Sequence, residues 1–350
     1  MRRRRAAIGL GVAVGAAAAA VAAERIAARR LRSRPDPEAG VDFAELPPED
    51  LGTIASFDGT RIAVRAAGAE DAPVLLFSHG FSLDMTTWHY QWKAFSDRYR
   101  CVLFDHRAHG RSGKPPGGEY AVRAMGRDLL AVLDHVSPQG PAVLVGHSMG
   151  AMSILAMAER DPSVFGDRVR GVVLADTAAS DIAREFFGSV GSRIERSLRP
   201  LTQRLTADLD RVERLRGRLT RVTDLSLLIA RATQFGPDAS PSQVAYLADL
   251  SSRARVEVWV HTAADIREMD LREALSAITV PALVVVGDRD MVTPKTSALA
   301  LREALPDAEA VVITRAGHVS MMEQHRVFNE VLARHLGRVL PAGEEAALRR

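Results

Sequence analysis

The sequence Val143-Leu144-Val145-Gly146-His147-Ser148-Met149-Gly150 runs from an apolar segment, through a serine near two glycines, into the helix-forming segment 151–158. This pattern predicts a strand, a very tight turn and a helix, with Ser148 at the apex of the turn. Both glycines suit the turn, because a Cβ at either position would collide with the neighbouring strand or helix. The turn also leaves the backbone N–H of Met149 free at a helix start, where partial positive charge favours an anion. The stretch therefore predicts a nucleophile and half of an oxyanion hole, although an ordinary strand-to-helix loop would also place a serine here.

Short apolar runs and helical runs alternate on both sides of this turn. Besides the strand before Ser148, the strand-like runs are Leu51–Phe57, Arg61–Ala66, Pro73–Phe77, Cys101–Phe104, Val169–Leu174, Ala282–Val286 and Glu309–Ile313. Besides the helix after Ser148, the helical runs are Trp88–Phe95, Tyr120–Val136, Lys295–Leu305 and Met321–Val339. This alternation predicts an α/β fold, with a mostly parallel, doubly wound sheet that helices cover on both faces.

The alternation stops at about Ala178 and resumes after about Asp270. Between these residues the sequence has helical patterns, and its one strand-like run is the short Val256–Val260. We therefore expect residues 51–177 and 271–340 to build the α/β core. Residues 178–270 would form a helical lid inserted after the sixth strand, with apolar residues for core packing, an acyl pocket or both.

The two ends of the chain differ from its body. Residues 1–34 carry nine Arg and one Glu around Ala6–Ala23, which are eighteen residues without charge. This segment predicts a single membrane-anchoring helix or a cleaved export signal, and a soluble Ala-rich helix is the third interpretation. The side of the membrane that the body would face stays open. The four prolines of residues 35–50 indicate a linker, and residues 341–350 a loose tail.

Charge and cysteine content limit the partners. The formal charge of the chain is +3, but residues 1–34 carry +8, so the other 316 residues carry −5. A mildly acidic body argues against nucleic acid as a partner. Cys101 is the single cysteine, which excludes a disulfide within the chain. The sequence carries no signal for the oligomeric state.

Five short motifs occur in order, each at the end of an apolar run or in the loop that follows it. They are His79-Gly80-Phe81, Asp105–Ser112, Gly146–Gly150, Gly287-Asp288-Arg289-Asp290 with Pro294, and Gly317-His318. Together they make residues 51–340 resemble the α/β-hydrolase family, as a serine hydrolase with a helical lid. One departure from the family pattern is Ala108, where relatives usually have Gly.

The resemblance implies a catalytic triad. Ser148 is the nucleophile, and His318 is the base that takes its proton, since an imidazole exchanges protons near neutral pH. Asp290 matches the position of the acid that orients the imidazole. Asp176, which follows another strand, and Asp288 are its rivals for that role. The order Ser, Asp, His along the chain agrees with that of the fold.

The resemblance also implies where the substrate binds. The backbone N–H of Phe81 would complete the oxyanion hole together with that of Met149. Further contacts with a small-molecule acyl substrate are expected from His79, Gly80, His147 and Trp259. Relatives that open epoxides or displace halide have Asp at the position of Ser148, so those reactions are disfavoured. The sequence has no Gly-rich dinucleotide loop and no metal-ligand cluster, so we expect neither a cofactor nor a metal site.

These features predict an enzyme that cleaves a carboxylic ester of apolar acyl character through an acyl-enzyme. The same scaffold could hydrolyse a carbon–carbon bond, a lactone or a thioester, or transfer the acyl group, because the lid and the pocket decide among these reactions. A non-catalytic binding protein on the same fold is the alternative from another class.

Overall fold

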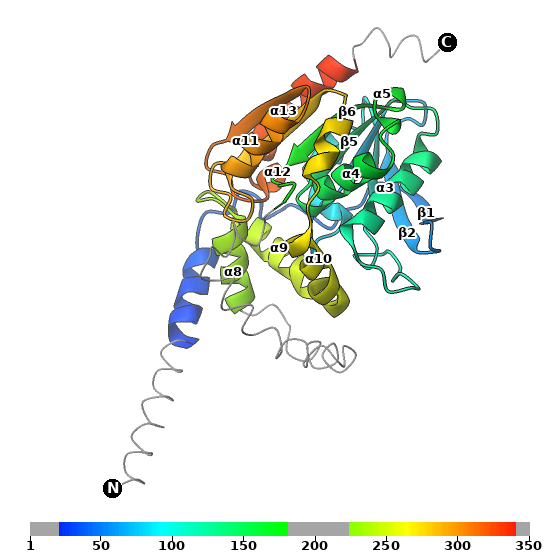
Figure 1. The fold of residues 1–350 in the computed structure, drawn as a ribbon. Helices are drawn as coiled ribbons and strands as arrows, with labels where there is room; N and C mark the ends of the chain where they lie inside the picture. The colour runs from blue at the N-terminus through cyan, green and yellow to red at the C-terminus, as the bar shows by residue number, and fades with distance from the viewer. Residues whose placement is uncertain (1–20, 181–223, 341–350) are drawn as a thin grey trace.

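An eight-stranded sheet forms the centre of the computed structural model, which describes residues 21–180 and 224–340 (Figure 1). Its strands are β1 (Glu49–Ala55), β2 (Arg61–Ala67), β3 (Val74–Ser78), β4 (Arg100–Phe104), β5 (Ala142–His147), β6 (Val169–Ala175), β7 (Ala282–Gly287) and β8 (Ala308–Ile313). Their order across the sheet is β1-β2-β4-β3-β5-β6-β7-β8. β2 runs antiparallel to both of its neighbours, and the other neighbouring pairs are parallel. The predicted mostly parallel sheet is therefore confirmed.

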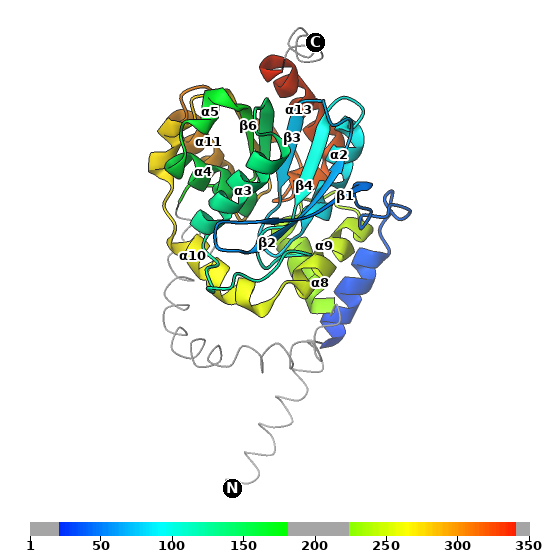
Figure 2. The same cartoon turned by 90° about the vertical axis from the view of Figure 1, so that its right-hand side faces the viewer.

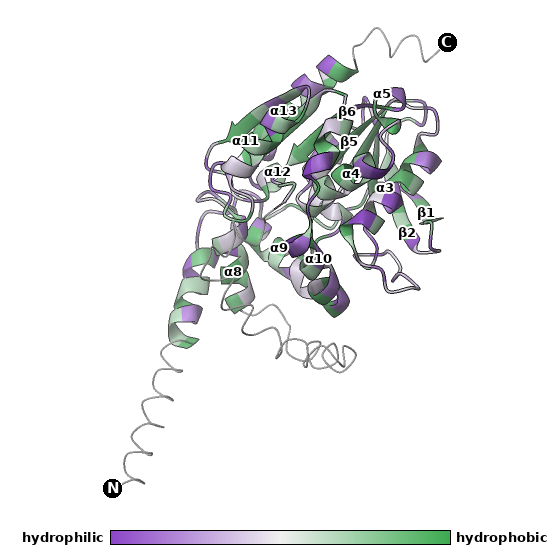
Figure 3. Ribbon diagram, viewed as in Figure 1, coloured by the Kyte–Doolittle hydropathy of each residue, from purple (hydrophilic) through white to green (hydrophobic). Residues whose placement is uncertain are grey.

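Helices cover both faces of the sheet (Figure 2). One face packs against α3 (Val122–Val136), α4 (Met149–Arg160) and α11 (Lys295–Ala304), and the other against α2 (His89–Phe95) and α13 (His325–Val339). The short helices are η1 (Met85–Trp88), α5 (Val164–Asp167) and α12 (Ser320–Glu323). Every residue of β3, β4, β5 and β7 is buried, which explains why these strands are largely apolar runs in the sequence. Figure 3 shows the hydrophobic colour of β5 at the centre of the fold.

The cap follows β6, as predicted, and lies at one end of the sheet (Figure 1). Its described elements are α8 (Asp224–Gln234), α9 (Pro241–Arg253), the π-helical turn η3 (Val258–Thr262) and α10 (Ala263–Glu268), and η4 (Arg272–Ala277) leads back to the sheet. Residues 181–223 of the predicted lid lie outside the described residues. The strand-like run Val256–Val260 is helical, so the prediction of a strand there is wrong. Val256 and Val258 are buried in this helical form, and such packing overrides the β-propensity of valine.

A helix over residues 21–32 lies beside α8 (Figures 1 and 2). Ala28 and Leu31 are buried, and Arg32 forms an ion pair of 2.7 Å with Asp224 at the start of α8. No described helix combines the length and the apolar character that crossing a membrane requires. Residues 1–20, which hold most of the predicted anchor or signal, lie outside the described residues, as does the predicted tail 341–350.

The residues between this helix and β1 contact the cap and the core. Asp36 accepts hydrogen bonds from the N–H and the hydroxyl of Ser242 in α9, at 3.1 and 2.6 Å. The hydroxyl of Tyr90 in α2 donates to Glu38 at 2.8 Å. The predicted linker, residues 35–50, is thus hydrogen-bonded to both the cap and the core.

Candidate active site

Ser148 occupies the tight turn between β5 and α4. Its φ of 50° and ψ of −118° are strained for a residue with a Cβ and cost about 1–3 kcal/mol. A Cβ on Gly146 would lie 2.5 Å from the backbone N of Ala151, and one on Gly150 would lie 2.1 Å from the carbonyl oxygen of Ser78 in β3. Because backbone atoms cannot give way, only glycine fits at both positions. These close contacts hold the strained serine above the carboxyl edge of the sheet.

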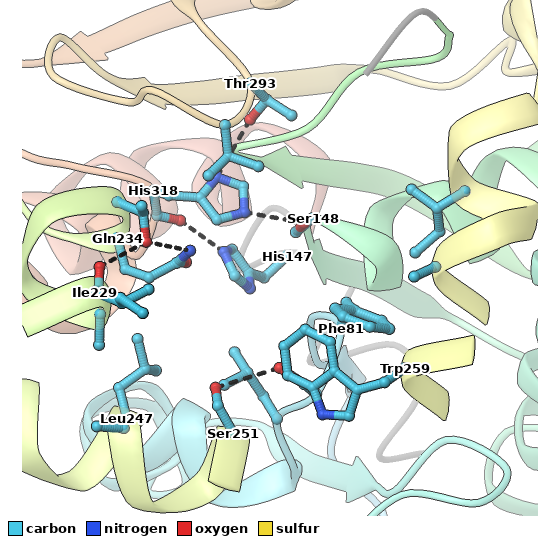
Figure 4. A pocket seen from close by; sticks show the side chains of 18 of the residues that line it. Phe81, His147, Ser148, Ile229, Gln234, Leu247, Ser251, Trp259, Thr293 and His318 are labelled. Carbon is cyan, nitrogen blue, oxygen red and sulfur yellow. Dashed lines mark hydrogen bonds between the residues drawn. The ribbon is translucent and has the colours of Figure 1, made fainter. Parts of the chain in front are cut away.

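Three side chains from three loops meet in one hydrogen-bonded chain, and Figure 4 shows its bond between Ser148 and His318. His318 Nε2 lies 3.0 Å from Ser148 Oγ, and His318 Nδ1 donates to Asp290 Oδ2 at 2.9 Å. Asp290 follows β7 and His318 follows β8, so both loops leave the edge of the sheet where the serine turn lies. With the proton on Nδ1, Nε2 is free to accept the proton of the Ser148 hydroxyl.

The loop after β7 orients the Asp290 carboxylate. Its Oδ1 accepts the N–H groups of Val292 and Thr293 at 2.8 and 2.9 Å, and its Oδ2 accepts the Thr293 hydroxyl at 2.8 Å. Burial favours the neutral acid, but the charge and hydrogen bond of His318 and the bonds from Thr293 outweigh it, and the pKa of Asp290 is lowered. Burial would also lower the pKa of His318, but the Asp290 charge and hydrogen bond raise it above 6.5. Each partner therefore stabilises the charged form of the other.

Asp176 is a second buried carboxyl group next to this chain. Its Oδ1 accepts the N–H of Gly287 at 2.9 Å, and its Oδ2 accepts the N–H and the hydroxyl of Ser320 at 3.0 and 2.6 Å. Burial and the nearby charge of Asp290 raise its pKa to about 8. Asp176 thus joins the start of α12 to the end of β7, and the imidazole hydrogen bond goes to Asp290 instead.

Asp288 lies in the same loop as Asp290 but bonds to the loop after β8. Its Oδ1 accepts the backbone N–H of Arg315 at 2.6 Å. The carboxylates of Asp288 and Asp290 are two residues apart in the chain, yet only that of Asp290 contacts His318. Asp288 therefore ties together the two loops that carry the acid and the base.

The segment after β3 passes directly beside the nucleophile. A Cβ on Gly80 would lie 3.4 Å from Ser148 Cβ and 2.5 Å from His147 Nδ1, so a side chain has no room. His79 Nδ1 donates to the carbonyl of Gly80 at 2.8 Å, which turns the N–H of the same peptide group, that of Phe81, away from His79. Among the described residues, neither this N–H nor that of Met149 donates to a protein acceptor. Both predicted oxyanion donors are therefore available.

His79 lies beneath the site rather than on its surface. It is fully buried, its Nε2 accepts the N–H of His106 at 3.0 Å, and its ring packs against the rings of His106 and His109. Burial lowers its pKa to about 4, so the ring stays neutral. Neither His79 nor Gly80 lines the substrate pocket, which differs from the predicted substrate contact. Their role in the structure is to shape the oxyanion segment.

His147 joins the serine turn to the loop of the base. Its Nε2 donates to the carbonyl of His318 at 2.7 Å, so its Nδ1 carries no proton. Burial and the nearby charge of His318 lower its pKa to about 3. The neutral ring lines the substrate pocket, as its predicted contact with the substrate requires (Figure 4).

The pocket opens from Ser148 into the cap and has a volume of about 800 Å³ (Figure 4). Both the core and the cap contribute apolar side chains to it, among them Phe81, Met152, Ile229, Leu247, Trp259 and Ile266. The rings of Phe81 and Trp259 meet edge to face, with centroids 4.9 Å apart. The predicted lid residue Trp259 therefore forms a wall of the pocket next to Phe81.

The carboxylate of Glu323 fastens the cap to the loop of the base. Its Oε2 accepts the N–H of Gly236, between α8 and α9, and the N–H of Gly317, both at 2.8 Å. A Cβ on Gly236 would lie 2.2 Å from the carbonyl oxygen of Arg315, so the two backbones are in direct contact. A displacement of this part of the cap would therefore move the loop that holds His318.

The loop after β4 packs against the segment that follows β3. Arg107 forms a buried, two-pronged ion pair with Asp128, with both distances 2.7 Å. Asp105 accepts the backbone N–H groups of Met85 and Arg111 at 2.8 and 2.7 Å. Ala108 has a φ of 61°, a conformation in which glycine is less strained, which fits the glycine that the family pattern implies at this position.

The described residues contain no group of three or more His, Cys, Asp or Glu side chains arranged to hold a metal ion.

Residues 73–324 match the family described as alpha/beta hydrolase fold. The chain belongs to this family. In this α/β hydrolase the loops that carry Ser148, Asp290 and His318 all lie within the matched residues.

Known proteins similar to this α/β hydrolase act on several kinds of substrate. The 3-oxoadipate enol-lactonase 2 of Acinetobacter baylyi is 27% identical over 270 residues, which cover 76% of this chain and 89% of the enzyme. The 2-(acetamidomethylene)succinate hydrolase of Mesorhizobium japonicum is 27% identical over 259 residues, which cover 74% and 86%. A thermophilic esterase from Thermogutta terrifontis superposes with a TM-score of 0.65 at 25% identity, covering 83% of this chain and 99% of the esterase.

Several residues that shape the site lie outside the five sequence motifs. Thr293 holds the acid, and its position three residues after Asp290 is a signal of a side-chain-capped turn that could have been used. Glu323 and Met152 have no such local signal, because their roles depend on segments distant in the chain.

Proposed function

We propose that this α/β hydrolase cleaves a carboxylic ester of apolar acyl character, with Ser148 as the nucleophile. The observation that carries the proposal is the hydrogen-bonded chain from Ser148 through His318 to Asp290 at the floor of an apolar pocket. A pocket of about 800 Å³ suits a small organic molecule. The similarity to an esterase and an enol-lactonase supports carboxylic ester chemistry.

Acylation begins when Ser148 Oγ attacks the carbonyl carbon of the ester and its proton moves to His318 Nε2. The carbonyl oxygen becomes an oxyanion, which the N–H groups of Phe81 and Met149 would hold, and each such donor typically contributes about 10²–10³ in rate. Asp290 stabilises the imidazolium that forms. His318 then returns the proton to the leaving alcohol, and the acyl group stays on Ser148.

Deacylation repeats the sequence with water. His318 Nε2 accepts a proton from water, whose oxygen attacks the acyl carbon, and the oxyanion is held by the same donors. The proton then passes to Ser148 Oγ as the bond to the acyl group breaks, which releases the carboxylic acid. Apolar side chains on the core and the cap favour an apolar acyl or alcohol group on the ester, because burial of such a group removes it from water.

Labelling and turnover test this proposal together. A fluorophosphonate probe is expected to label the wild-type protein and to leave Ser148→Ala unlabelled. The kcat for p-nitrophenyl octanoate is expected to fall by about 10⁵–10⁶-fold in that variant. Ser276→Ala, at an exposed serine of η4, serves as the matched control and keeps both labelling and turnover. Equal labelling of wild type and Ser148→Ala would remove Ser148 from the reaction and favour a binding protein.

A lactone is the second candidate substrate, because an enol-lactonase is among the similar enzymes. In a lactone the leaving alcohol remains attached to the acyl group, so water must attack before the ring closes again. A panel that pairs each lactone with the open ester of the same acid separates the two candidates by their kcat/KM values. Thioesters in the same panel test the thioester alternative.

We also propose that residues 1–34 hold the protein at a membrane. The uncharged run Ala6–Ala23 between arginine-rich flanks supports this proposal. Fractionation with a carbonate wash, followed by N-terminal sequencing, is expected to find the intact chain in the membrane pellet. A mature chain that starts near Ala23 in the soluble exported fraction would contradict it.

A further inference from the structure

A second cavity, of about 360 Å³, lies on the other side of the oxyanion segment. Ser82 and Leu83, which follow Phe81 in the chain, line both this cavity and the substrate pocket, so they form a common wall. The end of α9 and the loop after β4 build the rest of the cavity. It therefore lies where the cap meets the core, next to the reaction site but distinct from it.

Positively charged side chains outnumber negative ones around this cavity. Arg111, Arg253 and Arg255 line it, and Asp84 is the one carboxylate among its lining residues. Arg253 pairs with Asp249 one turn earlier in α9. Within the described part of the chain, no carboxylate pairs with the guanidinium groups of Arg111 and Arg255. Neither guanidinium is thus held in an ion pair with a described residue, although the charge of Arg111 acts on Asp50 and that of Arg255 on Glu257.

Two further polar side chains of the cavity, Asp84 and His109, already make hydrogen bonds. Asp84 Oδ1 accepts the N–H of Thr86 at 3.0 Å, as the cap of η1. His109 Nδ1 donates to the carbonyl of Arg107 at 2.9 Å, and its Nε2 accepts the N–H of Ser82 at 3.4 Å. Burial lowers the pKa of His109 to about 3, so its ring adds no charge. The binding capacity that remains is that of the two arginines.

We propose that this cavity binds a carboxylate or phosphate group through Arg111 and Arg255. A guanidinium presents two parallel N–H donors that match the oxygens of either anion, and such charge-assisted bonds are shorter and stronger than neutral ones. The anion is either the far end of the substrate whose acyl group reacts at Ser148, or a separate small anion. Both sources share the same chemistry of recognition.

The common wall gives an anion at this site a route to the reaction. Ser82 has a φ of 59°, and its hydroxyl lies 3.2 Å from that of Ser251 in α9. An anion held by Arg255, just after α9, and Arg111, on the core, would join the cap to the core beside Phe81. The binding site itself does not depend on the proposed hydrolysis, whereas the assignment of its anion to a substrate does.

Calorimetric titration tests the site without any turnover. Inorganic phosphate and suberate are titrated into Ser148→Ala at low ionic strength, with sodium chloride as the reference salt. We expect saturable binding of at least one anion, and a Kd at least tenfold weaker when Arg111→Gln and Arg255→Gln are added. Arg334→Gln, at an exposed arginine of α13, is the charge-matched control and leaves the Kd unchanged.

Two matched esters identify the source of the anion. Mono-p-nitrophenyl suberate carries a carboxylate where p-nitrophenyl octanoate carries a methyl group. If the anion belongs to the substrate, Arg255→Gln raises the KM of the suberate ester at least tenfold more than that of the octanoate ester. If the anion is separate, phosphate binds and changes octanoate turnover in the wild type, and this response is lost in Arg255→Gln. If the two Arg→Gln substitutions left the Kd of both phosphate and suberate unchanged, the proposal would be overturned, independently of the ester kinetics.

Discussion

The loops after β6 and β7 each carry a buried carboxyl group close to His318, yet the two groups differ in charge and in partners. Asp290 accepts the imidazole hydrogen bond, and its pKa is lowered. Asp176 accepts hydrogen bonds from Gly287 and Ser320, and its pKa is raised to about 8. Burial pushes both pKa values upward, so burial alone does not distinguish the two groups. The direct hydrogen bond from His318, which only Asp290 receives, distinguishes them.

This difference shows how one site keeps two acids without mutual repulsion. The imidazolium of His318 can neutralise one carboxylate at close range, and Asp290 takes that place. The charge of Asp290 then disfavours a second negative charge at Asp176, as in other pairs of neighbouring carboxyl groups. Asp290 is therefore suited to an electrostatic role in the reaction, and Asp176 to a structural one.

Among the tests that compare the two carboxyl groups, the largest effect is expected when Asp290 loses its charge. Asp290→Asn should lower kcat for p-nitrophenyl octanoate by about 10⁴-fold, because the amide favours the wrong tautomer of His318 and cannot stabilise the imidazolium. Asp288→Asn is the matched control, since this carboxylate lies in the same loop but bonds to Arg315. A control variant as inactive as Asp290→Asn would show that the loop, not the charge, is what matters.

The same substitution at Asp176, which follows the neighbouring strand β6, should have a much smaller effect on turnover. Asp176→Asn is expected to keep kcat within about tenfold of the wild type, because the hydrogen bond between His318 and Asp290 stays intact. Steady-state kinetics with the same ester measure this. If Asp176→Asn were inactive and Asp290→Asn active, the acid of the triad would lie after β6.

The pH dependence of kcat/KM should also distinguish Asp290 from Asp176. His318 must be neutral to act as a base, and its pKa is raised above 6.5, so kcat/KM should fall as the pH drops through that value. Asp290→Asn removes the group that raises this pKa most, so the acidic limb should move to lower pH. Asp176→Asn should move it less, because its contribution to the pKa of His318 is smaller. A limb at the same pH in all three proteins would contradict the assignment.

The last prediction concerns stability and not turnover. An unfolded Asp ionises near pH 3.9, whereas Asp176 in the folded protein ionises near pH 8. Between these values the folded state binds more protons, so the free energy of unfolding should decrease as pH rises from about 4 to 8. Asp176→Asn should flatten this dependence in urea unfolding series at several pH values, and Asp288→Asn should preserve it. An unchanged slope in Asp176→Asn would mean that this group ionises normally.

Much of the fold could be predicted, because local rules act on each segment. Fully apolar runs became strands buried on both faces, and the serine turn has the close contacts at Gly146 and Gly150 that its glycines indicate. The run Val256–Val260 shows the limit of such rules. Its β-branched residues suit a strand, but packing within the cap makes it helical.

The candidate site likewise has residues that local sequence motifs predict and residues that they do not. Motifs placed Ser148 and His318 at strand ends, since the residues that flank them carry the signal. The choice among Asp176, Asp288 and Asp290 needed the folded molecule, because all three follow strands and only the turn made by Val292 and Thr293 aims one of them at the imidazole. The pocket walls and the arginine-lined cavity likewise join side chains from segments far apart in the chain, and no local pattern records such distances.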